Sequence, residues 1–524
     1  MARVPWPQDV EAVFVRLAGR RGCVWLDSAG GPERLSRWSV LAAEPAAVLV
    51  HQADTTRLLA PDGAVRMAVA GRPFSALRQA LAAVSAGGDP APHDCPFGPG
   101  LYGYLAYDLG RYVEPTAGAA RVRDIPLPDL YMGAFETVLV LDGARREAHL
   151  VGRATGPSAE ALRAALGGAA ADAHPPGDPV GRATGTLRCT FRREAYLRAV
   201  DRCRAYIAAG DIFQVNLSRR FTCTFAGDAV SVRAAARGPS PRLTVDRLAA
   251  LYRRLRRSNP APYAAYVGLG QGRAVLSSSP ELFLNLSGDR VVTRPIKGTR
   301  PRRAARSTTK RGGSPYPPRA CAGSDVSAAG TETRRATDAE AFNRAMQADL
   351  LASEKDRAEL VMIVDLERND LGRVCSYGTV RVTEPRTVEA YAAVFHTVAT
   401  VEGRLHEGRD VVDLVRATFP GGSITGAPKV RAMQIVAELE PTRRSVYTGA
   451  IGYLGPPTPA EPAGRCTLNI AIRTLLAAGP NVHLPVGGGI VADSDPEAEF
   501  DETTDKARAL LAALGLTAEK ATSP

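Results

Sequence analysis

Apolar residues recur along the chain in short strand-like runs and in longer helical repeats. In the first part of the chain, runs such as CVWLDS, AAVLVHQ and FETVLVLD are separated by turn residues, which predicts strands. A short helical run in GPSAEALRAALG then gives way to a stretch rich in Ala, Pro and Gly, and the apolar pattern resumes near Cys189. This pattern predicts an N-terminal domain at residues 1–165, a linker at 166–186 and a second domain at 187–524.

The second domain mixes strands and helices irregularly. The amphipathic run FRREAYLRAVDRCRAYIAAGD predicts a helix that Gly210 stops, and strands are predicted at FQVNLSRRF, AYVGLG, RAVLSSS and ELFLNL. Further helices are predicted over residues 341–360, 428–438 and 497–514. Strands in hairpin-like runs with interspersed helices are typical of the α+β class.

The composition predicts a cytoplasmic chain that does not contact a membrane. With 524 residues, 45% of them hydrophobic, the chain can bury a large core, yet it has no long uncharged apolar run. The start, MARVPWPQDVEAVFVRL, lacks the apolar stretch of a signal peptide. Eight scattered cysteines without metal-ligand spacing are typical of reduced thiols.

Half of the net charge of +12 lies in one segment. Residues 302–335 hold eight Arg or Lys and two acids among Ser, Gly, Pro and Ala. This composition predicts a basic, disordered insertion at residues 303–338. Because Tyr316 is its only aromatic residue, the segment lacks the stacking platforms of a single-strand binder, and we expect no nucleic-acid partner.

Three glutamates form the first candidate site. Glu499 and Glu502 are three residues apart in the predicted C-terminal helix, so they share a helical face. Acids at a helix start are also favoured by the macrodipole alone, which is the structural alternative. Glu359 stands where another predicted helix becomes apolar, and a carboxylate there requires a partner. Carboxylates without neighbouring histidines suit a hard ion such as Mg²⁺.

Glycine-rich segments and an arginine form the second candidate site. In FPGGSITGAPKVRAM, Thr425 is placed to cap a helix that starts at Pro428, and such a helix start attracts anions. Gly487–Gly489 are predicted to form a second loop after a strand. Arg473 lies in the apolar run LNIAIRTLL, either as an internal ion-pair partner or as a fork for a substrate carboxylate.

Lys297 lies between Pro295 and Gly298 in TRPIKGTRPR. Proline fixes φ and glycine permits conformations that other residues avoid, so we predict that the lysine sits in a rigid turn. Taken alone, the pattern is that of a basic turn between strands. Together with the carboxylates and the glycine-rich segments, it indicates a site for a small dicarboxylate.

Nine stretches of the second domain follow one another in the order of a known family: GDIFQVNLSRRF, SSSPELFL, PIKGTRPR, SEKDRAELVMIVDLERNDLGRV, VFHTVATVEG, FPGGSITGAPKVRAM, YTGAIGY, IAIRTL and GGGIVADSDPEAEFDETTDKA. They resemble the chorismate-utilising enzymes, the family of the anthranilate synthase and aminodeoxychorismate synthase large subunits. In the first domain, VWLDSAG, RWSVLAAEP, YGYLAYDLGR and LPDLYMGAFETVLVLD look like the family's N-terminal domain.

The resemblance implies antiparallel β-sheets packed face to face with helices on the outside. It also implies that Glu359 and Glu502 hold magnesium, with Glu499 close by. The residues that it implies for chorismate binding are Gly298, Thr299, His396, Thr425, Tyr447, Arg473, Gly487, Gly488, Gly489 and Lys506. Thr299, His396 and Tyr447 also have a structural alternative, as packed or hydrogen-bonded core residues.

Lys297 and Asn216 are similar to the aminodeoxychorismate synthase type, whereas anthranilate synthases usually carry alanine and an apolar residue there. The resemblance implies that the Lys297 amine adds to the chorismate ring and expels the 4-hydroxyl, after which ammonia displaces the lysine. Glu281 is implied as the acid for the leaving hydroxyl; its alternative is a turn glutamate facing solvent. The predicted product is 4-amino-4-deoxychorismate, for 4-aminobenzoate and folate or for specialised aromatic metabolism.

Nothing in the sequence is similar to the cysteine-centred glutaminase of amidotransferases, so we expect a separate glutamine amidotransferase subunit to supply ammonia in a heterodimer. Ser28, Pro262 and Tyr263 match the family's tryptophan-site motifs only in part, and either hold tryptophan or simply pack.

Three other functions stay open at this point. Anthranilate synthase component I is the main alternative, and an isochorismate or salicylate synthase is disfavoured by GDIFQVNL. A basic binding module without activity is the third. The residues that argue against it are Glu281, Lys297, Glu359 and Glu502.

Overall fold

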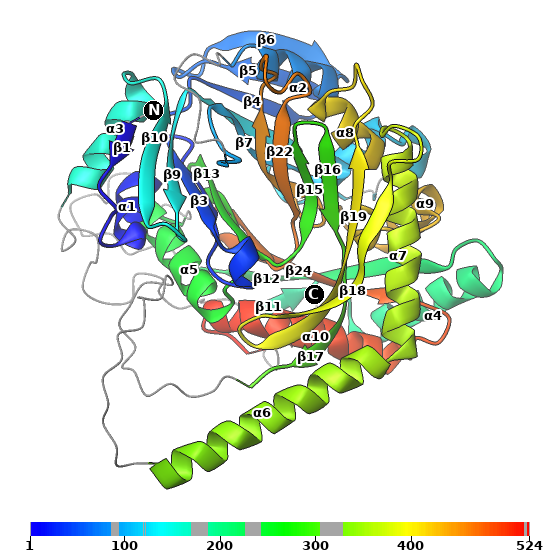
Figure 1. The fold of residues 1–524 in the computed structure, drawn as a ribbon. Helices are drawn as coiled ribbons and strands as arrows, with labels where there is room; N and C mark the ends of the chain where they lie inside the picture. Colours follow the sequence, from blue (N-terminus) through cyan, green and yellow to red (C-terminus); the bar gives the residue numbers. More distant parts are fainter. Residues whose placement is uncertain are drawn as a thin grey trace, which may run out of the picture.

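Two large β-sheets form the body of the molecule. In this computed structural model the described residues are 2–84, 94–118, 120, 122–168, 187–225, 243–303, 329–517 and 521–522. Within these ranges the strands form a 13-stranded sheet, here called sheet A, and a 12-stranded sheet, called sheet B. Figure 1 shows both sheets in the centre with helices around them. Neighbouring strands are antiparallel except for one pair, so the predicted α+β class is confirmed.

Sheet A joins strands from both ends of the chain. Its order is β1 (Ala2–Val4), β10 (Glu147–Gly152), β9 (Thr137–Asp142), β3 (Trp38–Ala42), β2 (Val24–Asp27), β13 (Tyr263–Gly270), β14 (Arg273–Ser279), β23 (Thr474–Ala478), β24 (Asn481–Ile490), β12 (Gln214–Thr224), β11 (Leu187–Cys189) and β25 (Ala521–Thr522). The short strand β20 (Gly426–Ala427) also pairs with β12. The parallel pair is β11 with β25.

Sheet B is built in the same mixed way. Its order is β17 (Ile296–Pro301), β19 (Val394–Arg404), β16 (Arg290–Arg294), β15 (Leu282–Ser287), β22 (Arg465–Ile470), β21 (Ala450–Gly455), β7 (Gly100–Leu105), β8 (Leu130–Phe135), β4 (Ala47–Gln52), β5 (Thr55–Leu59) and β6 (Val65–Ala70). Strand β18 (Arg381–Ala390) lies beside β19.

The inner faces of the two sheets pack against each other. Val40 of β3 and Val267 of β13 share one buried cluster with Tyr102 of β7 and Tyr453 of β21, so sheet A meets sheet B through aromatic and aliphatic side chains. Alternation along each strand directs these residues to one face. The predicted face-to-face packing is therefore confirmed.

Helices cover the outer faces of both sheets (Figure 1). Sheet A is covered by α1 (Val10–Ala18), α3 (Pro157–Gly167), α5 (Val245–Ser258) and α10 (Pro496–Ala513), and α4 (Arg193–Ala208) and α9 (Lys429–Leu439) pack beside β12 and β24. Sheet B is covered by α2 (Pro73–Ala82), α7 (Glu354–Gly372) and α8 (Val411–Thr418). Short 3-10 helices occur at Glu33–Leu35, Tyr107–Tyr112, Pro115–Ala117 and Gly422–Ile424.

The two predicted domains share both sheets. β2 pairs with β13 in sheet A, and β7 pairs with β21 in sheet B, so strands from before and after the predicted linker lie side by side. Most of that linker, at 169–186, lies outside the described residues. The domain boundaries at 165 and 187 stay predictions.

The helix predicted over residues 341–360 is wrong in its bounds. The chain instead forms α6 (Ala329–Ala352) and then α7, and Ser353 separates them as an N-cap whose hydroxyl accepts from Asp356 N–H. Figure 1 shows α6 along the outside of the molecule, and it packs against β17. Residues 304–328 of the predicted disordered insertion lie outside the described residues, whereas its end, from Ala329, is helical. Over the described ranges, no helix is long and apolar enough to span a membrane.

Candidate active site

A run of three glycines in β24 forms the floor of the site. Gly487, Gly488 and Gly489 pair with Ser218, Leu217 and Asn216 of β12, so their predicted placement in a loop after a strand is wrong. A β-carbon on Gly489 would lie 2.2 Å from Gln214 Nε2 and 3.5 Å from Lys297 Nζ. A β-carbon on Gly487 would lie 3.1 Å from Tyr447 Oη, and one on Gly488 would lie 3.0 Å from Glu499 Oε2. The missing side chains therefore let polar groups from β12, β17, α10 and the turn at Tyr447 approach one strand.

Lys297 lies in strand β17, not in the rigid turn predicted from its flanking prolines and glycine. It pairs with Thr397 of β19, and the register shifts at Gly298, which has a φ of +73°. This β-bulge bends strand β17 directly after Lys297 and so changes the direction of the side chains there. The Lys297 side chain is 12% exposed, and its Nζ lies 4.0 Å from Glu359 Oε2.

The three glutamates predicted for magnesium lie on two helices near this lysine. Burial raises the pKa of Glu359 in α7, and the neighbouring Asp356 and Glu502 add to that rise. Burial likewise raises the pKa of Glu499 in α10. Burial also acts upward on Glu502, but the ammonium of Lys506 holds its pKa below the usual range. Lys506 Nζ lies 2.5 Å from Glu502 Oε1 and donates to the Gly487 carbonyl at 3.0 Å.

These carboxylates fit a magnesium ion in part. Glu499 Oε2 is buried and has no hydrogen-bond partner among the described residues, and Glu359 and Glu502 repel each other's charged forms. A cation between them would relieve both effects. Over the described ranges, however, no three His, Cys, Asp or Glu side chains form a ready metal-binding group. Magnesium commonly needs only one or two carboxylates, with water and substrate as its other ligands.

Glu281 is buried at the start of β15, with a side chain that is 4% exposed. Burial raises its pKa to about 7, against the opposing effects of a hydrogen bond with Ser423 and the charge of Lys297. The solvent-facing alternative for this residue is therefore wrong. A carboxyl group with a pKa near neutral pH is suited to hold and release a proton.

His396 of β19 lies beside the Lys297 bulge. Its Nδ1–H donates to the Gly298 carbonyl at 3.2 Å and lies 3.0 Å from the Thr299 hydroxyl, which leaves Nε2 as an acceptor. Burial and the guanidinium of Arg473 lower the pKa of His396 to about 4, so the ring is neutral near neutral pH. Gly298, Thr299 and His396 thus form one hydrogen-bonded group.

Arg473 is not inside a strand as predicted but between β22 and β23, with a φ of +51°. Its guanidinium has no hydrogen-bond or ion-pair partner among the described residues, and burial lowers its pKa against the effect of Tyr447. Tyr447 is 4% exposed. The ion-pair alternative for Arg473 is therefore wrong within the described chain, and the guanidinium is available to an anion.

Thr425 does not cap α9, contrary to the prediction. Pro428 is the N-cap of that helix, and the fully buried Thr425 hydroxyl donates to the carbonyls of Gly421 and Gly422 at 3.0 and 3.2 Å. Its predicted contact with substrate stays a prediction.

Sequence reasoning missed Gln214, the first residue of β12. Its side chain is 2% exposed, and neither amide atom has a partner among the described residues. Asn216 Oδ1 is likewise buried and has no hydrogen-bond partner within the described chain. The period-two polar pattern of QVNLS placed both residues on one face, which was the available signal.

The family model of chorismate binding enzymes matches residues 21–512 of the chain. The chain belongs to the chorismate binding enzyme family. This confirms the predicted resemblance, and the matched range includes Lys297, Glu281 and all three glutamates.

Relatives of two kinds stand close to this family member. Component 1 of the aminodeoxychorismate synthase of Klebsiella aerogenes is 37% identical over 513 residues, which cover 98% of each chain. Component 1 of the anthranilate synthase of Thermus thermophilus is 41% identical over 421 residues, covering 80% of this chain and 78% of that one. The crystal structure of anthranilate synthase component I from Streptococcus pneumoniae aligns with a TM-score of 0.65 at 27% identity, covering 91% of this chain and 92% of that chain.

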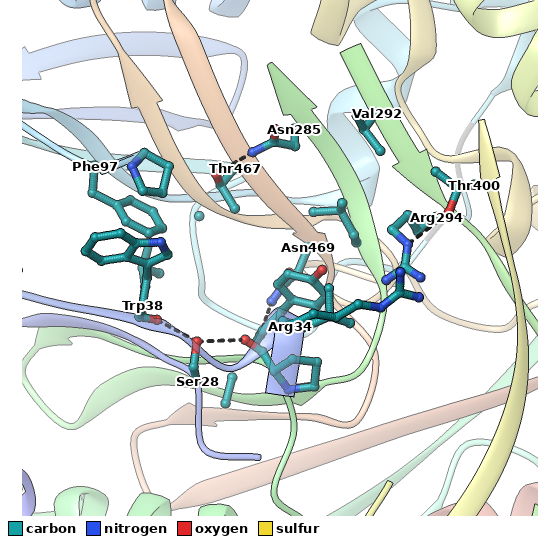
Figure 2. A pocket seen from close by; sticks show the side chains of 18 of the residues that line it. Ser28, Arg34, Trp38, Phe97, Asn285, Val292, Arg294, Thr400, Thr467 and Asn469 are labelled. Carbon is teal, nitrogen blue, oxygen red and sulfur yellow. Dashed lines mark hydrogen bonds between the residues drawn. The ribbon is translucent and has the colours of Figure 1, made fainter. Parts of the chain in front are cut away.

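A cavity of about 630 Å³ lies apart from the lysine, between the two sheets of this chorismate binding enzyme. Ser28, Pro262 and Tyr263, predicted as a tryptophan site, all line it. The Ser28 hydroxyl donates to the carbonyls of Trp38 and Pro262 at 2.5 and 3.3 Å (Figure 2). The cavity supplies space for a ligand at these residues, and tryptophan as that ligand stays a prediction.

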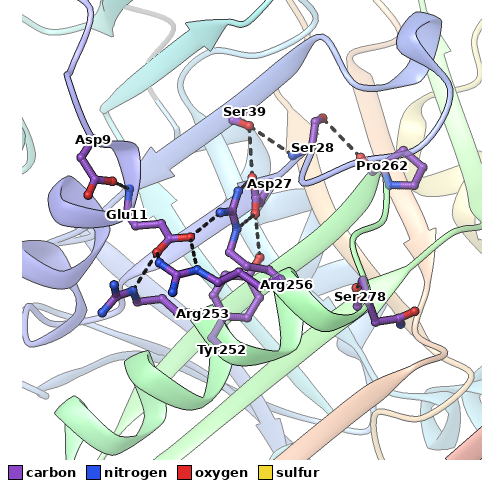
Figure 3. Close-up of polar contacts among 12 residues, drawn as sticks. Asp9, Glu11, Asp27, Ser28, Ser39, Tyr252, Arg253, Arg256, Pro262 and Ser278 are labelled. Atoms are coloured by element: carbon purple, nitrogen blue, oxygen red, sulfur yellow. Dashed lines mark hydrogen bonds and ion pairs between the residues drawn. The ribbon is translucent and has the colours of Figure 1, made fainter. Parts of the chain in front are cut away.

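A buried ion network holds the wall of this cavity. Asp27, next to Ser28, accepts from Arg256 Nε at 2.7 Å, and Arg256 Nη1 also donates to Glu11 at 2.7 Å (Figure 3). Arg253 donates to Glu11 at 2.9 Å. The network ties α1 and α5 to β2, and paired charges of this kind are costly to break singly.

Proposed function

We propose that this chain converts chorismate and ammonia to 4-amino-4-deoxychorismate, as the large subunit of an aminodeoxychorismate synthase. The observation that carries the proposal is the position of the Lys297 amine beside Gly489. Glu281, a buried carboxyl group with a pKa of about 7, accompanies it. The relative named aminodeoxychorismate synthase component 1 from Klebsiella aerogenes supports it over 98% of both chains.

Lys297 acts as the nucleophile. The lone pair of its amine adds to the ring at position 2, both conjugated ring double bonds shift, and the 4-hydroxyl leaves as water with the proton of Glu281. Ammonia then adds at position 4, both double bonds shift back and the lysine amine leaves. Glu281 takes the proton that the new amine loses, so the enzyme returns to its starting state.

The remaining polar groups bind and orient the substrate. Arg473 has no partner among the described residues and is suited to pair with one chorismate carboxylate. Lys506, which donates to the Gly487 carbonyl, is suited to pair with the second carboxylate. As part of this proposal, Tyr447, Thr425 and the group formed by Gly298, Thr299 and His396 contact the same substrate. The glycine floor brings the ring close to the lysine.

Magnesium belongs to this proposal. Glu359 and Glu502 would hold the ion, with Glu499 close by. When bound, the ion supplies a positive charge that neutralises a substrate carboxylate and draws electrons from the leaving-hydroxyl region. A glutamine amidotransferase partner in the cytoplasm supplies ammonia, and free ammonium replaces it in vitro.

Anthranilate synthase component I is the second candidate function. The relative from Thermus thermophilus, at 41% identity, favours it. In that reaction the amine goes to position 2 and pyruvate is lost. A lysine in the position of Lys297 disfavours it, because an amine directed at position 2 of the ring excludes ammonia from that carbon.

The test is product identification. Purified protein with chorismate, magnesium and ammonium is expected to yield aminodeoxychorismate, which gives 4-aminobenzoate only after a lyase is added. Fluorescent anthranilate appearing without the lyase would replace this proposal with the second candidate.

A further inference from the structure

The edge of β12 that faces away from β24 has a gap in its strand partners. At one end, Asn216 N–H donates to the Thr425 carbonyl at 2.9 Å, next to the short strand β20. At the other end, Arg220 N–H bonds the Thr190 hydroxyl at 2.9 Å, next to β11. Between them, the Asn216 carbonyl and the Ser218 N–H face no strand of the described chain, although buried backbone groups require partners.

An ion pair between Glu440 and Arg444 fills this gap. Glu440 Oε1 accepts from Ser218 N–H at 2.8 Å, and Arg444 Nη2 donates to the Asn216 carbonyl at 2.6 Å. The Glu440 side chain is 3% exposed and the Arg444 side chain 2%, and Arg444 Nη2 lies 2.6 Å from Glu440 Oε1. The carboxylate and the guanidinium therefore take the places of a carbonyl and an N–H of a neighbouring strand.

The guanidinium of Arg444 also donates to two other segments, those that contain Thr425 and Tyr447. Its Nη1 donates to the Ile424 carbonyl at 3.0 Å, one residue before Thr425, and to the Thr448 hydroxyl at 3.3 Å, one residue after Tyr447. The Tyr447 N–H donates to the Arg444 carbonyl at 3.2 Å. One buried side chain thus joins β12 at Asn216 to the two segments that carry the predicted substrate contacts Thr425 and Tyr447.

We propose that Arg444, held by Glu440, is a positioning residue that sets the placement of Asn216, Thr425 and Tyr447 around the substrate. The inference rests on the proposed function only for what the site binds. A purely structural ion pair would stabilise the fold without affecting how the substrate is held. A positioning residue must fix geometry, because small displacements of binding groups reduce reaction rates steeply.

Arg444→Lys is the main test, because lysine keeps the charge beside Glu440 but cannot bond the three acceptors together. We expect calorimetry to show chorismate binding weakened about tenfold, the scale of one lost hydrogen bond to a charged group. We also expect a smaller fraction of consumed chorismate to end as amino product. Arg443→Lys is the matched control, since the Arg443 side chain donates to the Ala120 carbonyl and makes no hydrogen bond to β12 or to the segments of Thr425 and Tyr447 within the described chain.

Glu440→Gln keeps an acceptor for Ser218 N–H and is expected to bind chorismate nearly as wild type does, whereas Glu440→Met is expected to resemble Arg444→Lys. If Arg444→Lys and Glu440→Met lower the melting temperature but leave chorismate affinity and product fraction unchanged, the positioning role is overturned. If Arg444→Lys does not fold, the contrast between Glu440→Gln and Glu440→Met decides in the same way. A wild type that binds chorismate but makes a different product would overturn the proposed function and leave this test intact.

Discussion

Lys297 Nζ lies 4.0 Å from Glu359 Oε2, so the candidate nucleophile and a candidate magnesium ligand face each other from a strand and a helix. The two residues are brought together by the packing of α7 against β17. This contact joins the two parts of the proposed site. One part is the lysine amine proposed as the nucleophile, and the other is the group of carboxylates proposed to bind a cation. It also means that a substitution at either residue changes the electrostatic environment of the other.

Glu359→Gln and Glu502→Gln are expected to lower turnover at least about a hundredfold, because each removes a charge that organises the site. Chelating magnesium is expected to have the same effect on wild type and little further effect on either variant. Initial rates measured against magnesium concentration check this. Glu354→Gln is the control, since Glu354 lies on the same helix with a side chain that is 82% exposed. Unchanged magnesium dependence in both variants would contradict the assignment of the metal site.

Glu281 predicts the pH dependence of the reaction. Burial raises its pKa to about 7, and the acid must be protonated to act, so kcat/KM is expected to fall as pH rises through about 7. Glu281→Gln is expected to remove this limb along with most of the activity. A profile in wild type that stays flat across this range would show that Glu281 is not the acid.

Glu367 predicts a pH effect on stability instead. It is 2% exposed, its Oε1 accepts from Gly422 N–H at 3.2 Å, and burial together with the charge of Asp370 raises its pKa to about 8. A raised pKa in the folded state gives stability that is complete below the unfolded-state pKa and is lost as pH rises through the folded-state value.

Glu367→Gln removes this titration. We expect the variant to gain at least about 2 °C in Tm over wild type above pH 8, with a much smaller gain near pH 5. Thermal unfolding at both pH values measures the difference. A constant offset at the two pH values would mean that Glu367 does not titrate as described.

Local pattern was sufficient to predict several of the elements around the site. The period-two runs of β12 and β14 and the amphipathic pattern of α10 each follow from residues within one segment, and the family stretches located Lys297, Glu281 and Glu359. The break between α6 and α7 also had a local signal, because Ser353 is followed by Asp356 in the spacing of an N-cap. The prediction of one helix over 341–360 runs across this N-cap signal.

The rest depends on contacts that are distant in sequence. Lys297 lies in a strand because β17 pairs with β19 about a hundred residues later, and nothing near Lys297 encodes that register. The same holds for Gly487–Gly489, which are in a strand because β12 lies beside them. Arg444 gave no signal at all, since its role appears only where β12 lacks a strand partner.

The most direct test of the central claim compares wild type and Lys297→Ala with chorismate, magnesium and ammonium labelled with heavy nitrogen, and locates the label on the product ring by NMR. Wild type is predicted to place the label at position 4. Lys297→Ala is predicted to lose that product at least about a hundredfold, with any remaining label at position 2. Lys297→Arg is expected to fail as well, because guanidinium stays protonated. Label at position 2 in wild type, or at position 4 in Lys297→Ala at the wild-type rate, would contradict the account.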